Sequence, residues 1–303
     1  MIRFRAFGKT YGAHSAVKCL DLSVARGEVV ALLGPNGSGK TTSLKAAAGL
    51  VRPTTGAVLV GDPGRPASDP EARRCLSFLP QRVAFPDSLS GQEVVRFHSR
   101  IRQGRPERAA EALEGASLNG AVVRAVSTYS GGMLQRLGLA VALLPDAPVF
   151  LLDEPTAALD PDGLESFYRV IARAKDDGRA VLFTSHQMGD AERLADRFAI
   201  LVGGRLVADI PAREMRDRLS ERGRMRLRVP GLDEATVEDL RLVAPGTTLS
   251  AGELLVPGAA SIRPRIIEML VIRGHRIADL VAEEGRLDDL YRELVASPAG
   301  SAS

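Results

Sequence analysis

Two adjacent carboxylates, Asp153 and Glu154, directly follow the apolar run at 149–152. The run predicts a buried strand, and charges at the end of such a strand are costly unless an ion accompanies them. We expect Asp153 to hold Mg²⁺ and Glu154 to accept a proton from an attacking water molecule. The pair therefore predicts phosphoryl chemistry, which requires a phosphate site nearby.

Residues 34–41 supply a candidate phosphate site. They read Gly34-Pro35-Asn36-Gly37-Ser38-Gly39-Lys40-Thr41, with Thr42 next, between an apolar run at 29–33 and a helix-like segment at 42–48. Strand, glycine-rich loop and helix form the context of a Walker A loop, whose backbone N–H groups cradle phosphate oxygens. Lys40 would reach the β- and γ-phosphates, and Thr41 would place its hydroxyl on Mg²⁺. A chance glycine-rich turn is the weaker alternative.

Two further polar side chains follow predicted strands. Gln81 comes just after the segment 75–79, and His186 comes at the end of the apolar run 180–184. Ligands of doubly wound sheets bind at the carboxyl ends of the strands, so His186 could contact a γ-phosphate there. A solvated loop glutamine and a structural histidine are the alternatives.

A second glycine-rich stretch begins a predicted helix. Ser130 is a plausible N-cap, and Gly131 and Gly132 follow it in the first turn. Free N–H groups at such a helix start offer a second anion-binding surface. An ordinary glycine-rich cap is the alternative interpretation.

The elements that position these groups predict an α/β fold. Apolar and polar residues alternate over 1–30, which indicates antiparallel strands broken by a turn at 8–12. Helical spacing begins at residue 82 and continues to about 145, with Ser90 and Glu93 as a capping box. Within this stretch, apolar residues recur at Val94, Phe97 and Ile101. A predicted hairpin at 198–208 ends the nucleotide-binding part of the chain.

Composition excludes several classes of protein. The 303 residues are 45% hydrophobic and 25% charged, with net charge +3, as in a globular chain of one large or two ordinary domains. Only 4% are aromatic and none is Trp, which argues against stacking on single-stranded nucleic acid. The two cysteines, Cys19 and Cys75, are far apart in the sequence and suit a reducing compartment.

The start of the chain lacks the apolar region of a signal peptide, and no apolar run approaches the ~18 residues that span a bilayer. We expect a cytoplasmic protein that acts at a membrane through a partner.

The last third of the chain predicts a separate module. We expect a nucleotide-binding part at 1–212, a charged linker at 213–223 and an accessory α+β domain at 224–303. The predicted order of strands and helices is β-α-β-β-α-β, which is ferredoxin-like, followed by a helix at 287–296. The arginine-rich stretch at 213–228 is most simply a solvated linker helix that enters a strand, and binding of lipid headgroups or an acidic partner is the alternative.

Six features now stand in a fixed order: residues 34–41, Gln81, residues 129–133, residues 149–154, residues 158–160 and His186. In this order they resemble the motifs of ATP-binding cassette (ABC) ATPases, over about residues 1–210. The resemblance implies a P-loop, RecA-like core with an antiparallel β subdomain and a helical subdomain at about 82–145. It also implies that the chain binds ATP and Mg²⁺.

The resemblance further implies roles for individual residues. Tyr11 would stack on adenine, Gln81 would sense Mg²⁺ and the attacking water, and His186 would hold the γ-phosphate. Asp160 would act across the interface of a homodimer. Ser130, Gly131 and Gly132 would complete the site of the opposite subunit. ATP binding would then close the homodimer, and hydrolysis would reopen it to drive separate membrane permease subunits.

Three passages, at 68–74, 128–144 and 287–291, are similar to NosF-type ATPases. This branch serves the copper-related ABC transporter of nitrous oxide reductase maturation. ATPases of drug and polysaccharide exporters share much of the same sequence. The chain itself offers no copper chemistry, so membrane subunits and a periplasmic accessory protein would handle such a cargo at the inner face of the cytoplasmic membrane. A nucleic-acid-associated ABC ATPase, suggested by the basic charge balance, is the remaining alternative, although no nucleic-acid partner is expected.

Overall fold

The computed structural model describes residues 1–102, 106–115, 118, 120–185, 188–250, 252–258, 260–283, 285 and 291–293. The chain forms two compact units, the first over Met1–Ile210 and the second beginning at Pro211. The boundary lies close to the division that we expect after residue 212. Within the described part of the chain, no helix is long and apolar enough to span a bilayer.

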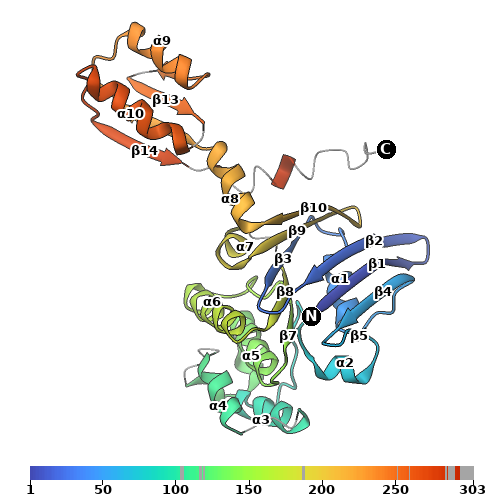
Figure 1. Ribbon diagram of the computed structural model, residues 1–303. Coiled ribbons are helices and arrows are strands. Elements are labelled where there is room, and N and C mark those ends of the chain that lie inside the picture. The colour runs from blue at the N-terminus through green and yellow to red at the C-terminus, as the bar shows by residue number, and fades with distance from the viewer. Residues whose placement is uncertain are drawn as a thin grey trace. The chain divides into compact units, whose positions relative to one another are not determined.

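A six-stranded sheet with the order β10-β9-β3-β8-β7-β6 forms the core of the first unit (Figure 1). Neighbouring strands from β9 to β6 are parallel. All residues of β3, β7 and β8 are buried, as expected for central parallel strands that are covered on both faces. The strands are β3 (Val29–Leu33), β6 (Leu76–Leu79), β7 (Val149–Asp153), β8 (Ala180–Thr184), β9 (Arg197–Val202) and β10 (Arg205–Pro211).

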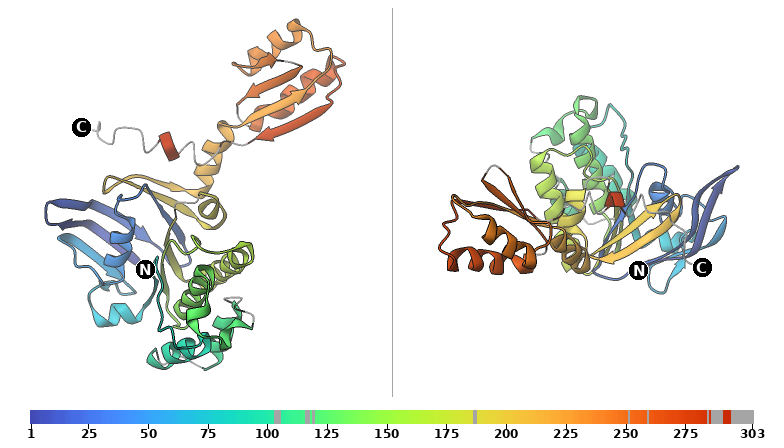
Figure 2. Two further views of the ribbon diagram at one scale, coloured as in Figure 1. Left: turned by 180° about the vertical axis from the view of Figure 1, so that it is seen from behind. Right: turned by 90° about the horizontal axis from the view of Figure 1, so that it is seen from above.

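Helices and a second sheet cover the two faces of this core. On one side lie α1 and the antiparallel sheet, and on the opposite side lie α5 and α6 (Figures 1 and 2). The helices are α1 (Lys40–Ala47), α5 (Gly131–Leu143), α6 (Pro161–Asp176) and the short α7 (Met188–Leu194). This layered arrangement confirms the predicted α/β class.

The antiparallel sheet has the strand order β2-β1-β4-β5. Its strands are β1 (Ile2–Tyr11), β2 (His14–Val24), β4 (Thr55–Val60) and β5 (Arg65–Pro66). The predicted turn at 8–12 is wrong, because β1 continues to Tyr11 and the turn lies at Gly12 and Ala13. Shifts of register between β1 and β2 interrupt the alternation of apolar residues, so the bulged strand looks like a turn in the sequence.

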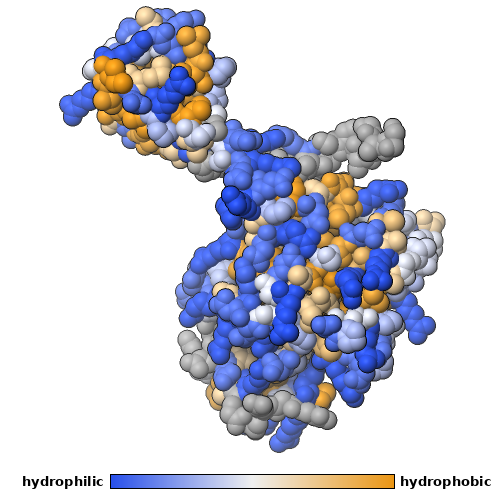
Figure 3. Space-filling view, viewed as in Figure 1, coloured by the Kyte–Doolittle hydropathy of each residue, from blue (hydrophilic) through white to orange (hydrophobic). Residues whose placement is uncertain are grey.

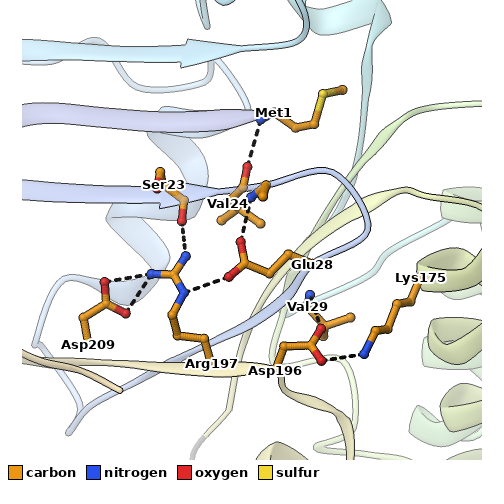
Figure 4. A network of polar contacts seen from close by, with 10 residues as sticks. Met1, Ser23, Val24, Glu28, Val29, Lys175, Asp196, Arg197 and Asp209 are labelled. Atoms are coloured by element: carbon orange, nitrogen blue, oxygen red, sulfur yellow. Dashed lines mark hydrogen bonds and ion pairs between the residues drawn. The ribbon is translucent and has the colours of Figure 1, made fainter. Parts of the chain in front are cut away.

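A network of polar contacts ties the antiparallel sheet to the core sheet (Figure 4). Arg197 on β9 donates to Glu28 at 2.8 Å, to Asp209 on β10 at 2.7 Å and to the Ser23 carbonyl oxygen on β2. Glu28 in turn accepts a hydrogen bond from the Ala25 N–H at 2.7 Å. Because Arg197 is mostly buried and its guanidinium contacts both sheets, it fixes the end of β2 beside the core.

The helical subdomain contains α3 (Gly91–Ile101) and α4 (Pro106–Gly115), which pack against α5, with short 3₁₀ turns at Ala121–Val123 and Val126–Thr128. The predicted capping box is confirmed, since the Glu93 N–H donates to the Ser90 hydroxyl and Glu93 accepts from the Ser90 N–H at 2.8 Å. The buried side chains of α3 are not the ones that the apolar spacing in the sequence predicts. Val94 and Val95 are buried, whereas Phe97 and Ile101 are 56% and 61% exposed. A further short helix, α2 (Pro70–Arg74), precedes β6.

The second unit has the predicted ferredoxin-like arrangement. Its four strands follow the order β12-β13-β11-β14, and all neighbours are antiparallel. Apolar side chains are also visible on its surface (Figure 3), and Leu242 and Ile272 are 81% and 76% exposed. The last strand begins at Asp279 and not at 276, and most of the expected helix at 287–296 lies outside the described residues. The elements are α8 (Ala212–Glu221), β11 (Arg224–Arg228), α9 (Glu234–Val243), β12 (Thr248–Ser250), β13 (Glu253–Pro257), a 3₁₀ turn (Ala260–Ile262), α10 (Arg263–Ile272) and β14 (Asp279–Glu283).

Candidate active site

The loop between β3 and α1 depends on glycine for its shape. Gly39, the N-cap of α1, has a φ of 104°, in the left-handed region that other residues rarely adopt. A Cβ atom on Gly39 would lie 2.6 Å from the carbonyl oxygen of Ala16. The loop therefore passes close to β2. Because Gly39 has no side chain, it cannot cap the first turn of α1. The backbone N–H groups of that turn are therefore left as donors for an anion.

Two polar side chains of the loop are buried in a way that a phosphate would explain. Ser38 Oγ is buried and has no hydrogen-bond partner among the described residues, and an unsatisfied buried hydroxyl costs on the order of 1–3 kcal/mol. Lys40 Nζ donates to the carbonyl oxygens of Gly34 at 2.7 Å and Pro35 at 3.2 Å. Burial lowers the pKa of Lys40, although the charges of Glu154 and Asp153 raise it. An anion in the loop would satisfy Ser38 and stabilise the Lys40 charge.

Asp153 lies at the end of β7, with 1% of its surface exposed. Its Oδ1 accepts hydrogen bonds from Thr41 Oγ1 at 3.1 Å and from Thr184 Oγ1 at 2.8 Å. Burial raises the pKa of Asp153, and these two hydrogen bonds oppose that rise. A hydroxyl and a carboxylate side by side are hard oxygen ligands, and this donor set fits Mg²⁺.

Glu154 adopts a left-handed backbone conformation, with a φ of 48°. A residue other than glycine keeps such a conformation only where its surroundings enforce it, and such strain is typical of functional sites. The Glu154 N–H donates to Thr184 Oγ1 at 2.8 Å, and its carboxylate accepts from Gln81 Nε2 at 2.8 Å. The structure thus brings Gln81 to the carboxylate that sequence analysis singled out as a base.

The second glycine-rich stretch begins α5 as predicted. Ser130 is its N-cap and accepts a hydrogen bond from the Met133 N–H at 3.3 Å. Ser130 and Gly131 are exposed. A Cβ atom on Gly132 would lie 2.6 Å from the carbonyl oxygen of Ala158, so the helix start packs against the turn that follows β7. This helix start is open to solvent.

The remaining predicted residues have different surroundings. Asp160 is the N-cap of α6, where it accepts from the Gly163 N–H at 2.9 Å, and it pairs with Arg136 of α5. Tyr11 ends β1 and is 47% exposed, and Lys9 Nζ lies 4.9 Å from its ring centre. The exposed ring leaves a face for stacking, although no hydrogen bond or ring contact joins Tyr11 to the loop at 34–41 among the described residues. His186 lies outside the described residues.

Sequence analysis missed Thr184. It ends the apolar strand β8, is fully buried, and hydrogen bonds with both members of the carboxylate pair. Its position as a hydroxyl residue at the end of an otherwise apolar run was the available signal. The structure therefore brings together Lys40, Thr41, Gln81, Asp153, Glu154 and, in addition, Thr184.

Comparison with known families agrees with this geometry. A family model described as "ABC transporter" matches residues 17–157. The doxorubicin resistance ATP-binding protein DrrA of Mycobacterium tuberculosis is 32% identical, over 97% of this chain and 93% of its own length. The linearmycin resistance ATP-binding protein LnrL of Bacillus subtilis is 29% identical, over 97% of this chain and 98% of its own. YxlF of Bacillus subtilis, an uncharacterised ABC transporter ATP-binding protein, is 38% identical over 68% of this chain and 69% of its own.

Solved structures of similar proteins cover the first part of the chain. The ATP-binding subunit of an ABC transporter matches 72% of this chain and 92% of its own, with 26% identity and a TM-score of 0.66. The cassette MJ0796, solved as a dimer in a post-hydrolysis state with ADP and Pi, matches 70% of this chain and 99% of its own. That match has 27% identity and a TM-score of 0.65. The matches extend the agreement from the motifs to the arrangement of the elements.

Proposed function

This chain belongs to the ATP-binding proteins of ABC transporters, and from this premise we propose that it powers the export of drug-like compounds through separate membrane subunits. The observation that carries the proposal is the extent of the match to drug-resistance ATPases. DrrA and LnrL align with 97% of the chain, whereas the family model ends at residue 157. The second unit is thus a feature that this protein shares with ATPases named for drug resistance.

The protein is an ATPase, and its own residues suffice to assign the steps of hydrolysis. The glycine-rich loop and Lys40 bind the triphosphate through N–H and ammonium donors. Glu154, whose carboxylate is oriented by Gln81, accepts the proton of the attacking water. Mg²⁺, held by Thr41 and Asp153, would neutralise charge on the phosphate oxygens.

A second copy of the chain completes each site in this proposal. Ser130 and Gly131 lie at a solvent-exposed helix start with free N–H donors, the kind of surface that binds a phosphate of a neighbouring subunit. ATP bound by the loop of one chain would then contact Ser130 and Gly132 of the other. Closure of the dimer on two ATP molecules, and its release after hydrolysis, would drive the membrane subunits.

The helical subdomain offers a surface for those membrane subunits. Phe97 and Ile101 on α3 and Val123 in the following 3₁₀ turn are more than half exposed. Exposed apolar side chains on one subdomain are typical of a protein interface. Through this surface the protein would associate peripherally with the inner face of the cytoplasmic membrane.

The role in nitrous oxide reductase maturation stays a prediction. It depends on three short passages that resemble NosF-type ATPases, one of which, 287–291, lies almost entirely outside the described residues. The full-length relatives reported above instead carry drug-resistance names. For this reason we favour an exporter.

One experiment separates the two cargoes. The gene is deleted in its host, and the strain is complemented with the wild type or with Glu154→Gln. We expect deletion to increase sensitivity to doxorubicin, the wild type to restore resistance, and Glu154→Gln to fail. Unchanged drug sensitivity together with a loss of nitrous oxide reductase activity would refute the exporter and support the maturation role. Mass spectrometry of the membrane subunit that co-purifies identifies the partner independently.

A further inference from the structure

A buried carboxylate outside the predicted site, Asp190, lies at the start of α7. Only 4% of its surface is exposed. Burying an unpartnered carboxylate is costly, so its partners must compensate for the lost hydration. Asp190 lies four residues after His186, and the motifs of the sequence assign it no role.

Each oxygen of Asp190 accepts a hydrogen bond from a different element. Thr156 Oγ1, in the turn after β7, donates to Oδ2 at 2.5 Å. Tyr168 OH, on α6, donates to Oδ1 at 2.6 Å. The carboxylate therefore joins three segments: the turn that follows Glu154, the middle of α6 and the first turn of α7.

The Tyr168 side of this junction is reinforced by further contacts. The Arg193 guanidinium lies 4.1 Å from the centre of the Tyr168 ring and pairs with Glu165 at 2.8 Å. Burial and the hydrogen bond to Asp190 raise the pKa of Tyr168 to about 12, so its hydroxyl remains a donor. Asp190 is thus held by contacts with α6 and α7, and its second oxygen binds Thr156.

Thr156 matters because Glu154 is strained. The left-handed backbone of Glu154 needs support on both sides to persist. Before it, Thr184 Oγ1 accepts from the Glu154 N–H at 2.8 Å. After it, the buried Thr156 is fixed to Asp190. Between them, the Pro155 carbonyl oxygen accepts a weaker hydrogen bond from Gln135 Nε2 at 3.4 Å.

We propose that Asp190 is a positioning residue, which holds Thr156 and thereby keeps the Glu154 carboxylate in its catalytic orientation. It acts on the hydrolysis step and does not touch the nucleotide. Its loss therefore affects kcat and leaves the contacts of the phosphate loop intact. The proposal rests on Glu154 as the base that activates water.

The decisive variant is Thr156→Val, which keeps the size of the side chain and removes the hydroxyl. We expect kcat for ATP hydrolysis to fall on the order of ten-fold or more, because small displacements of a catalytic group are costly. KM for ATP should change less than about two-fold, since the contacts that bind ATP equally in the ground state and the transition state are not altered. Thr156→Ser, which restores the donor, should return kcat to near the wild-type value.

Thr247→Val is the matched control, because Thr247 is also a buried threonine whose hydroxyl donates a short hydrogen bond, to the Ala244 carbonyl oxygen at 2.7 Å, but it lies in the second unit. We expect it to lower Tm while kcat stays within about two-fold of the wild type. Circular dichroism melts set the assay temperature below the transition of every variant. If Thr156→Val does not fold, Thr156→Ala replaces it, because it also removes the hydroxyl that Asp190 holds, and the same loss of kcat at constant KM is expected.

Two results would overturn the proposal. One is a wild-type kcat for Thr156→Val, and the other is an equal loss of kcat for Thr156→Val and Thr247→Val, which would indicate that the loss of a buried threonine hydroxyl acts through stability alone. Glu154→Gln is measured in parallel. If that variant keeps the wild-type rate, the assignment of the base fails, and this failure is distinguishable from a failure of Asp190 to position it.

Discussion

At the scale of single residues, three residues of the candidate site are held in conformations or surroundings that cost free energy. Glu154 has a strained backbone, Asp153 is almost fully buried, and Ser38 Oγ lacks a hydrogen-bond partner among the described residues. Each of these states costs free energy. A bound cation and phosphate would offset the cost at Asp153 and Ser38, whereas the strain at Glu154 persists because the surrounding contacts enforce it.

The first prediction concerns Glu154. Replacing it by Gln keeps the hydrogen-bonding shape and removes the proton acceptor. Because general-base catalysis contributes about 10²–10⁴-fold, ATP turnover measured by phosphate release should fall by at least about 100-fold. ATP should still bind and hold a dimer, as seen by size-exclusion chromatography. The matched control is Glu214→Gln, an exposed carboxylate paired with Arg218 in the second unit, which should keep full activity.

The second prediction concerns pH and Tyr168. Burial and the hydrogen bond to Asp190 raise the folded pKa to about 12, above the ordinary value of 10.0, so the neutral hydroxyl of Tyr168 stabilises the fold below pH 10. That stabilisation is lost progressively as pH rises from 10.0 to about 12, because the unfolded chain releases this proton first. Burial also raises the pKa of Tyr129 and Tyr291, so ultraviolet titrations near the tyrosinate band are compared between the wild type and Tyr168→Phe. The difference between the two curves should be one tyrosine that titrates at about pH 12, and a difference centred near pH 10 would contradict the assignment.

At the scale of elements, the proposed contacts with other chains lie at the start of one helix and on the exposed face of another. Ser90 and Ser130 are both N-caps that accept a hydrogen bond from the N–H three residues later. Ser90 belongs to a complete capping box within the subdomain, whereas Ser130 precedes two glycines at an exposed helix start. The same local chemistry thus stabilises one helix and offers a binding surface at the other.

A third prediction compares these two caps. Loss of an N-cap hydroxyl costs about 1 kcal/mol, so Ser90→Ala and Ser130→Ala should lower the free energy of unfolding by similar amounts. Only Ser130→Ala should reduce ATP turnover, because only that hydroxyl would contact the nucleotide of a second chain. Urea titrations give the stabilities and phosphate release gives the rates. Equal turnover in the two variants would count against the shared site.

A fourth prediction concerns the exposed face of α3. Phe97→Ser should leave ATP hydrolysis by the isolated subunit within about two-fold of the wild type, since surface substitutions have small effects on the fold. It should reduce the amount of membrane subunit that co-purifies after detergent extraction. Leu242→Ser is the control, because Leu242 is a more exposed apolar residue of the second unit. An undiminished yield of membrane subunit with Phe97→Ser would place the contact elsewhere.

At the scale of the whole molecule, the two units have separate cores. The core of the first unit includes Phe7, Leu32 and Leu151, and that of the second includes Met225, Leu254 and Ile266. Every residue that the structure brings to the site belongs to the first unit. The second unit therefore contributes none of the residues that the structure brings to the site.

The fifth prediction follows from this division. A chain that ends after Pro211 keeps β10 whole and should fold and hydrolyse ATP, because neither its core nor its site loses a residue. Circular dichroism and phosphate release test the two parts of this statement. An insoluble or inactive product would show that the second unit is required for the fold or for catalysis.

The success of sequence analysis varied with how local each feature is. The β3 strand, the loop at 34–41 and the cap at Ser130 were predicted, because neighbouring residues decide them. The turn near Tyr11 and the exposed face of α3 were not, since bulges and packing partners decide those. Apolar spacing says that a helix has a buried face, but Val95, not Phe97, packs inside.

The sequence by itself determined the family, the order of the elements and the residue types needed to bind a nucleotide. Tertiary structure alone decided which polar groups meet: Gln81 with Glu154, Thr184 with Asp153, and Thr156 with Asp190. The physical reason is that a hydrogen bond depends on distances of a few tenths of an ångström between segments far apart in the chain. Motifs fix the chemistry of each group locally, and only the packed sheet brings those groups within reach of one another.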